Sequence, residues 1–204
     1  RTVASNQLIG DKVFRSTDGG ETWNQKYTGT SKTLTEIQFI DSKNGWIAGS
    51  TEIFRTTNGG INWTGYNTTD HIISSLFFIS KNIGWITGGE GIIYKTSNGG
   101  INWVQQQANG NQYSQLKSIY FINENNGWIV GNGLGTGGVV LKTTNSGATW
   151  NMVSNGMGSF LNSVTFLDEN NGWLAGSKGK IFKTADGGLT WEETGSSTNN
   201  DLLS

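Results

Sequence analysis

The chain has 204 residues and a net charge of −1, and only 14% of its residues are charged. This balance excludes the strongly basic surface that is typical of nucleic-acid binding. No apolar run approaches the ~20 residues of a membrane-spanning helix, so membrane insertion is not expected. The sequence contains no Cys and no Pro, which excludes disulfides and leaves the turns to Gly, Asn, Asp and Ser.

The elements predicted in chain order are short β-strands between Gly- and Asn-rich turns. A strand is expected at residues 2–5, and the eight-residue phrase STDGGETW follows at 16–23. The segments EIQFI, GWIAG and EIFRT come next, and the phrase then returns as TTNGGINW at 56–63. Runs of β-branched and aromatic residues between turn residues are typical of strands, and no sustained 3.6-residue period is present.

The phrase that ends in Trp occurs five times, with its Trp residues 40 to 47 positions apart. A second phrase, Gly-Trp-Ile/Leu-x-Gly, lies between successive copies, and its Trp residues are expected to be buried. Periods of this length indicate a propeller or a solenoid, and four short strands per period favour propeller blades. The sequence therefore predicts an all-β fold, a β-propeller of four-stranded antiparallel blades with five repeat units. The Trp residues of the second phrase are Trp46, Trp85, Trp128 and Trp173.

We expect residues 1–204 to form a single propeller domain. The expected blade units are residues 1–27, 34–66, 73–107, 116–154 and 161–195. Residues 196–204 then begin a further first strand or close the first blade, because Leu202 aligns with the first-strand residues Leu34, Ile73, Leu116 and Leu161. Two arrangements remain open: a five-bladed ring in which the termini meet, or a part of a longer array.

The phrase has a mechanical interpretation as the turn between the third and fourth strands. Side-chain oxygens of its Ser or Thr and its Asp or Asn accept backbone N–H bonds, and its Gly adopts a conformation that a Cβ disfavours. Its Trp then buries a large apolar area between sheets. The residues in these structural positions are Ser16, Asp18, Gly20 and Trp23; Thr56, Asn58, Gly60 and Trp63; Thr96, Asn98, Gly100 and Trp103; Thr143, Asn145, Gly147 and Trp150; and Thr184, Asp186, Gly188 and Trp191.

The pattern Ser/Thr-x-Asp/Asn-x-Gly-x-x-Trp resembles the Asp-box, also called the BNR repeat. Its pairing with the Gly-Trp phrase is most similar to the photosystem II assembly and stability factor-like propellers, and the resemblance covers essentially the whole chain. It implies a propeller that binds protein clients. Asp-boxes also occur in sialidases, xyloglucan-degrading endoglucanases and sortilin-type receptors. This chain departs from the ideal box by having Asn in three of five copies and Ser146 at a Gly position.

Candidate catalytic and metal-binding residues are scarce. The resemblance to sialidases would imply a cluster of three arginines, but the only arginines are Arg1, Arg15 and Arg55. The acidic residues show no recurring pair of the kind that ordinary glycosidases use. Only two of the five boxes contain a carboxylate, whereas a hard cation needs several converging anionic oxygens. We therefore expect no catalytic residue, no metal and no cofactor.

A basic residue directly precedes every box. Two interpretations are open for this set. The side chains cover the blade edges and pair locally, or they form a basic ring that docks an acidic partner. The residues are Arg15, Arg55, Lys95, Lys142 and Lys183.

The face opposite the boxes is expected to carry the longer loops. These loops are residues 68–72, 109–114, 155–160 and the Gly-rich insertion at 131–138. Aromatic residues at loop tips are enriched in interfaces. The exposed candidates for a binding surface on these loops are His71, Tyr113, Met157 and Phe160.

The sequence thus predicts a non-catalytic protein-binding or scaffold module, either assembly-factor-like or a secreted or cell-surface repeat protein. One alternative is a carbohydrate-active module, sugar-binding or related to glycosidases. Another is a structural repeat of a surface layer or filament. A protein partner is expected, with carbohydrate as the alternative and nucleic acid excluded, and the expected location is secreted or at the cell surface.

Overall fold

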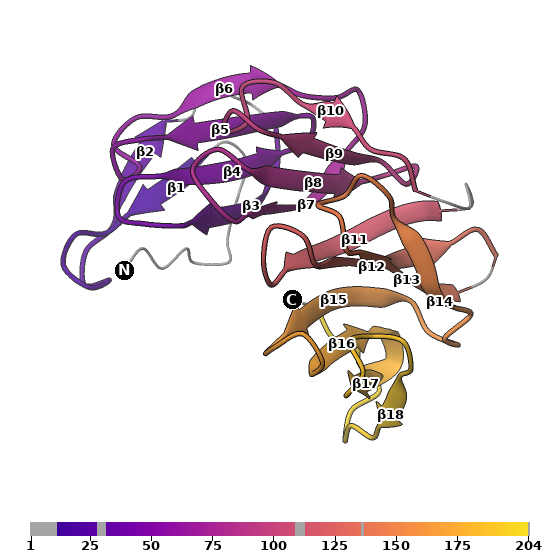
Figure 1. Ribbon diagram of the computed structural model, residues 1–204. Coiled ribbons are helices and arrows are strands. Elements are labelled where there is room, and N and C mark those ends of the chain that lie inside the picture. The colour runs from indigo at the N-terminus through magenta and orange to yellow at the C-terminus, as the bar shows by residue number, and fades with distance from the viewer. Residues whose placement is uncertain (1–11, 28–31, 109–112, 136, 204) are drawn as a thin grey trace.

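The computed structural model describes residues 12–27, 32–108, 113–135 and 137–203, and these residues form an arc of consecutive antiparallel sheets (Figure 1). One sheet has two described strands and four sheets have four strands each. Helical structure in the described part is limited to the short 3-10 turn η1 (Ser177–Gly179), so no described helix has the length to cross a membrane. The predicted all-β fold of four-stranded antiparallel blades is confirmed.

The sheets follow the chain as simple meanders, and we number them as units along it. Unit 1 contains β1 (Lys12–Arg15) and β2 (Asn24–Tyr27). Blade 2 contains β3 (Leu34–Phe39), β4 (Gly45–Gly49), β5 (Glu52–Thr56) and β6 (Thr64–Asn67). Blade 3 contains β7 (Ile73–Phe78), β8 (Gly84–Gly88), β9 (Ile93–Thr96) and β10 (Val104–Gln105). Blade 4 contains β11 (Tyr113–Phe121), β12 (Gly127–Gly133), β13 (Gly137–Thr143) and β14 (Asn151–Asn155). Blade 5 contains β15 (Leu161–Phe166), β16 (Gly172–Gly176), β17 (Ile181–Thr184) and β18 (Glu192–Thr194).

Two expected segments need comment. The strand expected at residues 2–5 lies outside the described residues. The Gly-rich insertion at 131–138 was expected to be a loop, and most of it is strand instead. Gly133 at the end of β12 pairs with Gly137 at the start of β13. The extra residues therefore lengthen the β12–β13 hairpin by further paired positions.

Neighbouring blades meet along their first strands, since β3, β7, β11 and β15 contact one another in that order. A side chain at one repeated position accepts a hydrogen bond from the backbone of the next first strand. Ser75 and Ser118 provide a hydroxyl for this bond, at 3.4 Å and 3.3 Å. In blade 2 the position is held by Glu36, whose Oε2 accepts the bond from Leu76 N at 2.6 Å. Burial raises the pKa of Glu36 to about 7 despite that bond.

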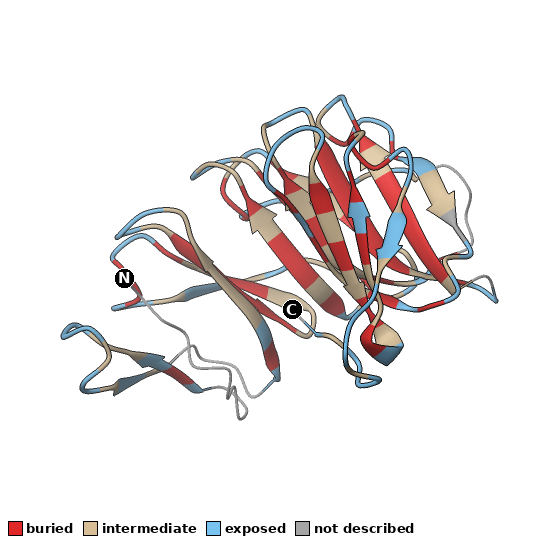
Figure 2. Cartoon of the chain, turned by 90° about the horizontal axis from the view of Figure 1, so that it is seen from below, coloured by how far each residue is buried: buried red, intermediate tan, exposed pale blue. Residues whose placement is uncertain are grey.

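Aromatic rings fill the space between the blades. The second-strand Trp of blades 2, 3 and 4 stacks on the first-strand Phe of the next blade, and that Phe meets the edge of the Trp in its own Asp-box. Figure 2 shows the buried positions running along the strands, with exposed residues mainly at the turns. The stacked pairs and their centroid distances are Trp46–Phe78 (3.8 Å), Trp85–Phe121 (3.7 Å) and Trp128–Phe166 (3.6 Å).

The expected burial of the second-strand Trp residues therefore holds for three of four. Trp46, Trp85 and Trp128 are at most 1% exposed. Trp173 is only half-buried, because no described blade follows blade 5.

The glycine before each of these Trp residues is required by packing. A Cβ built on Gly84 would lie 2.5 Å from the Phe78 ring, and one built on Gly127 would lie 2.5 Å from the Phe121 ring. Both distances are shorter than real carbon contacts, so the Phe ring lies flat against the backbone only where Cβ is absent. In each internal Gly-Trp phrase, the Gly thus lies beneath the Phe of its own blade and the Trp stacks on the Phe of the next blade.

The first prediction concerns this close approach. Gly84→Ala should lower the free energy of unfolding by about 1–3 kcal/mol, because the added methyl group must displace the Phe78 ring. Gly195→Ala is the matched control, since a Cβ at Gly195 meets no atom within 4 Å. Urea unfolding followed by Trp fluorescence measures both variants. Equal effects of the two substitutions would contradict the packing argument.

The second prediction concerns Glu36. Its pKa in the folded protein is raised from 4.5 to about 7, so its contribution to stability is full below about pH 4.5 and is lost as the pH rises through about 7. Between about pH 5 and about pH 8, the wild-type chain should lose about 1–3 kcal/mol more unfolding free energy than Glu36→Gln. Urea unfolding at the two pH values tests this. Parallel pH profiles for the two chains would show that the carboxyl group is not responsible.

Candidate functional site

The Asp-box turns use their polar side chains to hold their own backbone. In the second box, Thr56 Oγ1 accepts from Gly60 N at 2.9 Å and donates to Asn58 Oδ1 at 2.9 Å. Asn58 Oδ1 in turn accepts from Asn62 N at 3.0 Å. The equivalent residues of the other four boxes form the same bonds.

In the two boxes that contain Asp, the carboxylate accepts the same backbone hydrogen bond as Asn does in the other boxes. The hydroxyl and backbone N–H of Thr22 hold the pKa of Asp18 well below its usual value, and Thr190 does the same for the pKa of Asp186. Such carboxylates stay ionised and already accept several bonds, which suits a turn better than proton transfer. Across the described ranges, no three His, Asp or Glu side chains come together in a group that would hold a metal ion.

The basic residues before the boxes reach from one unit to the next. Three of them donate a hydrogen bond to the carbonyl of the fourth residue in the following box. The bonds join Arg15 Nε to Gly59 O (2.6 Å), Lys95 Nζ to Ser146 O (3.0 Å) and Lys142 Nζ to Gly187 O (2.8 Å). Lys95 and Lys142 also lie over the second-strand Trp of their own blade, with Nζ 5.3 Å from the ring centroid in each case. Burial lowers the pKa of Lys95.

The other two basic residues complete the set. Arg55 lies against the next box, where a Cβ built on Gly99 would be 2.8 Å from its guanidinium. Lys183, in the last described blade, is exposed, with Nζ 5.9 Å from the centroid of the Trp173 ring. Four of the five side chains are thus part of the contacts between units. These contacts favour local pairing over an open basic ring.

The face opposite the boxes contains a pocket of about 600 Å³ between blades 4 and 5. Strand direction alternates within each meander, so the β12–β13 and β16–β17 turns and the β14–β15 connection all lie on this loop face. Five glycines of the β12–β13 and β14–β15 segments line the pocket and leave room within it. The other lining residues are Ser114, Leu134, Ser159, Phe160, Ser177 and Lys178.

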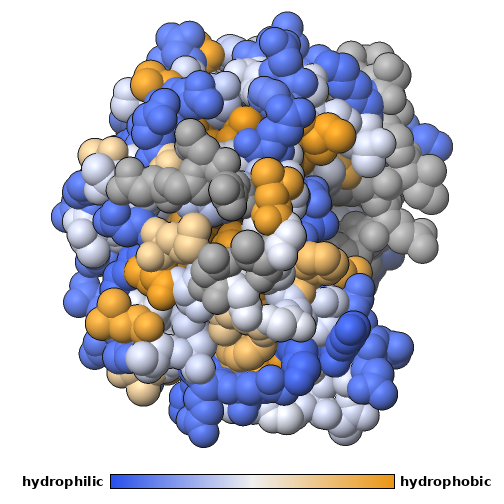
Figure 3. All heavy atoms as spheres, turned by 90° about the vertical axis from the view of Figure 1, so that its right-hand side faces the viewer, coloured by the Kyte–Doolittle hydropathy of each residue, from blue (hydrophilic) through white to orange (hydrophobic). Residues whose placement is uncertain are grey.

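Two exposed apolar side chains flank this loop-face pocket. Leu134, at the tip of the β12–β13 hairpin, is 59% exposed, and Phe160 is 55% exposed. Phe160 is fixed by its backbone, because its N–H donates to Ser177 Oγ at 3.1 Å and its carbonyl accepts from Ser177 N at 2.8 Å. Figure 3 views the side of the molecule on which the β12–β13 connection lies and shows hydrophobic residues among hydrophilic ones. Exposed apolar residues beside a pocket indicate a binding surface.

Polar groups complete the pocket. Ser159 Oγ donates to Ser177 O at 2.8 Å. Lys178 takes a left-handed conformation with φ 59°, and its N–H donates to Asp201 Oδ1 at 3.0 Å. The described lining contains hydroxyl groups and one cation, and neither a carboxylate nor an imidazole. Such a lining can hold an apolar side chain and hydrogen-bond a peptide or hydroxyl group.

The remaining candidates from the sequence have different outcomes. His71 lies on the loop face, with Nδ1 3.5 Å from Glu90 Oε2, and Glu90 N donates to the carbonyl of the pocket residue Ser114. Met157 is half-buried and packs against the core between blades 4 and 5. The expected exposure of Tyr113 is wrong. It begins β11, is 7% exposed and joins a core cluster, and this burial raises its pKa. Residues 109–112 of the same loop lie outside the described part.

Sequence reasoning missed several pocket residues. Leu134 lies in the insertion at 131–138, whose extra length relative to the other repeats was the available signal. Ser159, Ser177 and Lys178 lie in short turns that resemble ordinary turn sequences, so their convergence follows only from the packing of blade 4 against blade 5.

Comparison with known structures shows the same fold. YCF48 from Cyanidioschyzon merolae is 16% identical, with 95% of this chain and 81% of that chain covered and a TM-score of 0.59. A structure described as YCF48 bound to D1 peptide is 17% identical, with coverage of 95% and 88% and a TM-score of 0.55. The GH74 xyloglucanase from Xanthomonas campestris is 11% identical, with coverage of 96% and 36% and a TM-score of 0.71. No curated protein matches the sequence.

Family models place the chain more specifically. The BNR/Asp-box repeat matches residues 14–25. The family described as photosynthesis system II assembly factor YCF48 matches residues 66–156 and 142–202, which together span more than half of the chain. The chain therefore belongs to the YCF48 family of Asp-box propellers.

Proposed function

We propose that this chain is a non-catalytic protein-binding propeller and that the loop-face pocket is its binding site. The partner is a protein segment that places an apolar side chain between Leu134 and Phe160. The observation that carries this proposal is the pocket itself: about 600 Å³, flanked by two apolar side chains that are more than half exposed. Apolar anchors at the centre of a preformed pocket provide most of the affinity in many protein interfaces.

The polar lining supports an extended peptide as the bound form. The polar residues Ser114, Ser159 and Ser177 line the pocket, and Lys178 adds a positive charge. These groups can satisfy the backbone N–H and C=O of a peptide, which must keep hydrogen-bond partners when it leaves water. The glycines allow the backbone of the site to approach such a peptide closely.

The relatives support the same class of partner. The family is described as an assembly factor, and one of the similar structures is YCF48 bound to a D1 peptide. The GH74 xyloglucanase shares the fold, but this chain spans only 36% of its length. Glycoside hydrolysis in most families needs two facing carboxyl groups, and the described pocket lining supplies none. A protein ligand therefore fits the pocket better than a hydrolysed sugar.

The third prediction tests the site. Peptides selected against the full chain from a random display library should lose about tenfold to a hundredfold in affinity on Phe160→Ala, because an aromatic anchor is removed. Leu134→Ser should weaken binding in the same direction. Ile101→Ala is the matched control, since Ile101 is also exposed, at 44%, but lies in an Asp-box turn on the opposite face. Isothermal titration calorimetry measures each Kd.

Xyloglucan oligosaccharides serve as the competing ligand in the same assay. Binding of these sugars that depends on Phe160, with no peptide selected, would replace the proposal with the carbohydrate-active alternative. Selected peptides whose affinity falls equally with Phe160→Ala and Ile101→Ala would place the binding site elsewhere.

A further inference from the structure

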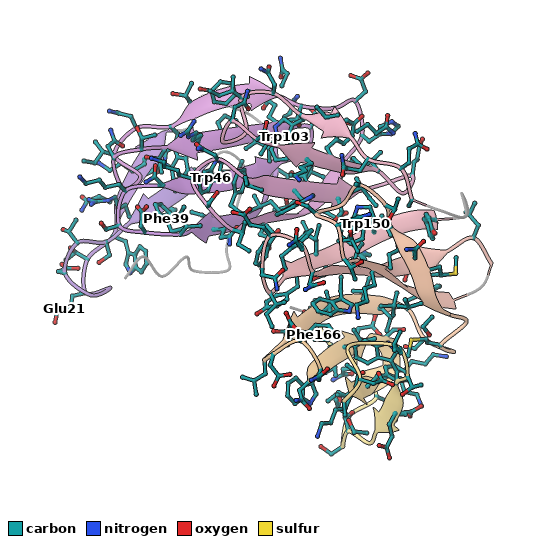
Figure 4. The ribbon with its side chains drawn as sticks, viewed as in Figure 1. Glu21, Phe39, Trp46, Trp103, Trp150 and Phe166 are labelled. Carbon is teal, nitrogen blue, oxygen red and sulfur yellow. The ribbon has the colours of Figure 1, made fainter. Side chains whose placement is uncertain are left out.

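The connection between β14 and β15 forms one wall of the loop-face pocket. It lies at the ends of these strands away from Trp150 and Phe166, which Figure 4 labels in blades 4 and 5. Two of its residues, Gly158 and Ser159, line the pocket. A matching connection joins β6 to β7, between blades 2 and 3. The repeat itself therefore shows which hydrogen bonds such a segment makes elsewhere in the chain.

The two connections can be aligned through a shared backbone contact. In each, the last residue before the first strand accepts a hydrogen bond from the residue that follows the second strand of that blade. The acceptors are Ile72 O in blade 3, at 2.9 Å, and Phe160 O in blade 5, at 2.8 Å. Counting back from this contact, His71 corresponds to Ser159 and Thr69 corresponds to Met157.

In two connections a Thr hydroxyl holds the backbone N–H of the residue two positions later. Between blades 2 and 3, His71 N donates to Thr69 Oγ1 at 3.1 Å. After blade 5, Asn200 N donates to Thr198 Oγ1 at 3.1 Å, two residues before Leu202. This bond is a local turn that residue type and spacing specify.

The β14–β15 connection lacks this bond, because Met157 stands where the other two connections have Thr. A thioether sulfur is only a weak acceptor. Ser159 is 6% exposed, and within the described part of the chain neither its N–H nor that of Gly158 donates a hydrogen bond. A buried donor without an acceptor is unfavourable and rare in folded proteins. These two N–H groups therefore point to an acceptor that a ligand supplies.

Both nitrogens adjoin open space in the pocket. A Cβ built on the pocket residue Gly137 would lie 3.7 Å from Gly158 N and 3.9 Å from Ser159 N. Gly156 and Gly158, on either side of Met157, have positive φ angles of 72° and 66°. Backbone that changes between left-handed and right-handed conformations turns successive N–H groups to one side and forms a concavity for an anion.

The hydroxyl protons of the pocket are already used within the protein. Ser159 Oγ donates to Ser177 O at 2.8 Å, so the Ser177 hydroxyl is the donor in its 3.1 Å contact with Ser159 Oγ. Ser114 Oγ donates to Asn132 O at 3.1 Å. Among the described lining residues, the donors that remain for a ligand are the two backbone N–H groups and the ammonium group of Lys178.

Lys178 gives this part of the pocket a positive charge. It is exposed, and its ammonium group forms no ion pair with a described residue. The neighbouring carboxylate of Asp201 accepts from Lys178 N at 3.0 Å and is not part of the lining. Two backbone donors beside a cation match a carboxylate, whose two oxygens can accept from both kinds of group.

We infer that the loop-face pocket binds a carboxylate group of its peptide partner, held by the N–H groups of Gly158 and Ser159 and by the Lys178 ammonium. The inference rests on the proposed function, because it names the group that accompanies the apolar side chain between Leu134 and Phe160. A neutral carbonyl would use the N–H groups but leave the charge of Lys178 unpaired.

The fourth prediction compares two small probes by NMR titration of the ¹⁵N-labelled full chain. N-acetyl-phenylalanine has an aromatic ring and a free carboxylate, and N-acetyl-phenylalaninamide differs only in its neutral amide. The acid should bind about tenfold or more tightly, because charge-assisted hydrogen bonds are the stronger ones. Only the acid should move the amide proton resonances of Gly158 and Ser159 downfield. N-acetyl-aspartyl-phenylalaninamide, whose carboxylate is on a side chain, shows by comparison which kind of carboxylate the site prefers.

Two variants of one residue test the role of the unbonded N–H. Met157→Thr supplies the hydroxyl that the corresponding connections have, so the Ser159 N–H gains an acceptor within the chain. The acid should then bind about tenfold more weakly. Met157→Val is the matched control, because it shortens the same half-buried side chain without adding an oxygen. It should keep the preference for the acid over the amide. Lys178→Gln should reduce that preference.

Equal affinity of the chain for the acid and the amide would overturn the carboxylate inference and leave the proposed protein-binding function in place. Equal loss of acid binding in Met157→Thr and Met157→Val would overturn it as well, since packing would then explain both effects. A chain that binds none of the probes would also overturn it. The proposed function is judged separately, by the selected peptides and their response to Phe160→Ala.

Discussion

The stack of a second-strand Trp on the first-strand Phe of the next blade is the interaction on which this propeller depends. It fixes the distance and angle between sheets, because the rings lie 3.6 to 3.8 Å apart and within 15° of parallel. Other repeated features accompany this stack. They are the Gly beneath the Phe, the basic side chain near the Trp and the Asp-box of the next blade. A ring that lies flat needs a strand without Cβ, and the indole N–H groups of Trp46 and Trp128 donate to the next box, at Gly99 O and Gly187 O.

Repetition in the sequence made the fold and the box turns predictable. Each eight-residue phrase is a local structure whose bonds join residues no more than four positions apart, so its residues and spacing specify it. The Gly-Trp phrase likewise indicated a buried second strand. Contacts between blades were harder to predict, because the basic residues donate to acceptors 44 to 51 positions away. The recurrence of the basic residues is visible in the sequence. The same spacing is expected for a free basic ring and for residues that contact the next blade, so the sequence does not distinguish the two.

Positions at which the chain departs from its own repeat were harder to interpret from the sequence. Glu36 stands where Ser75 and Ser118 stand in later blades, and only the burial of that position turns the substitution into a titrating group. Tyr113 lies in a segment that the sequence assigns to an exposed loop. In the structure β11 begins at this residue, and its side chain is buried in the core. The pocket combines the β12–β13 insertion with turns of blade 5, so no single stretch of sequence contains it.

The contacts between units also affect how such a chain can change through evolution. Strand contacts between units involve immediate neighbours, and three units donate a hydrogen bond from the basic residue before the box to the box of the next unit. Duplication or loss of one repeat of about 40 residues would therefore join surfaces that already fit, as in other arrays stabilised by nearest-neighbour terms. Blade number in this lineage is thus open to change by recombination, without new interfaces having to arise by point mutation.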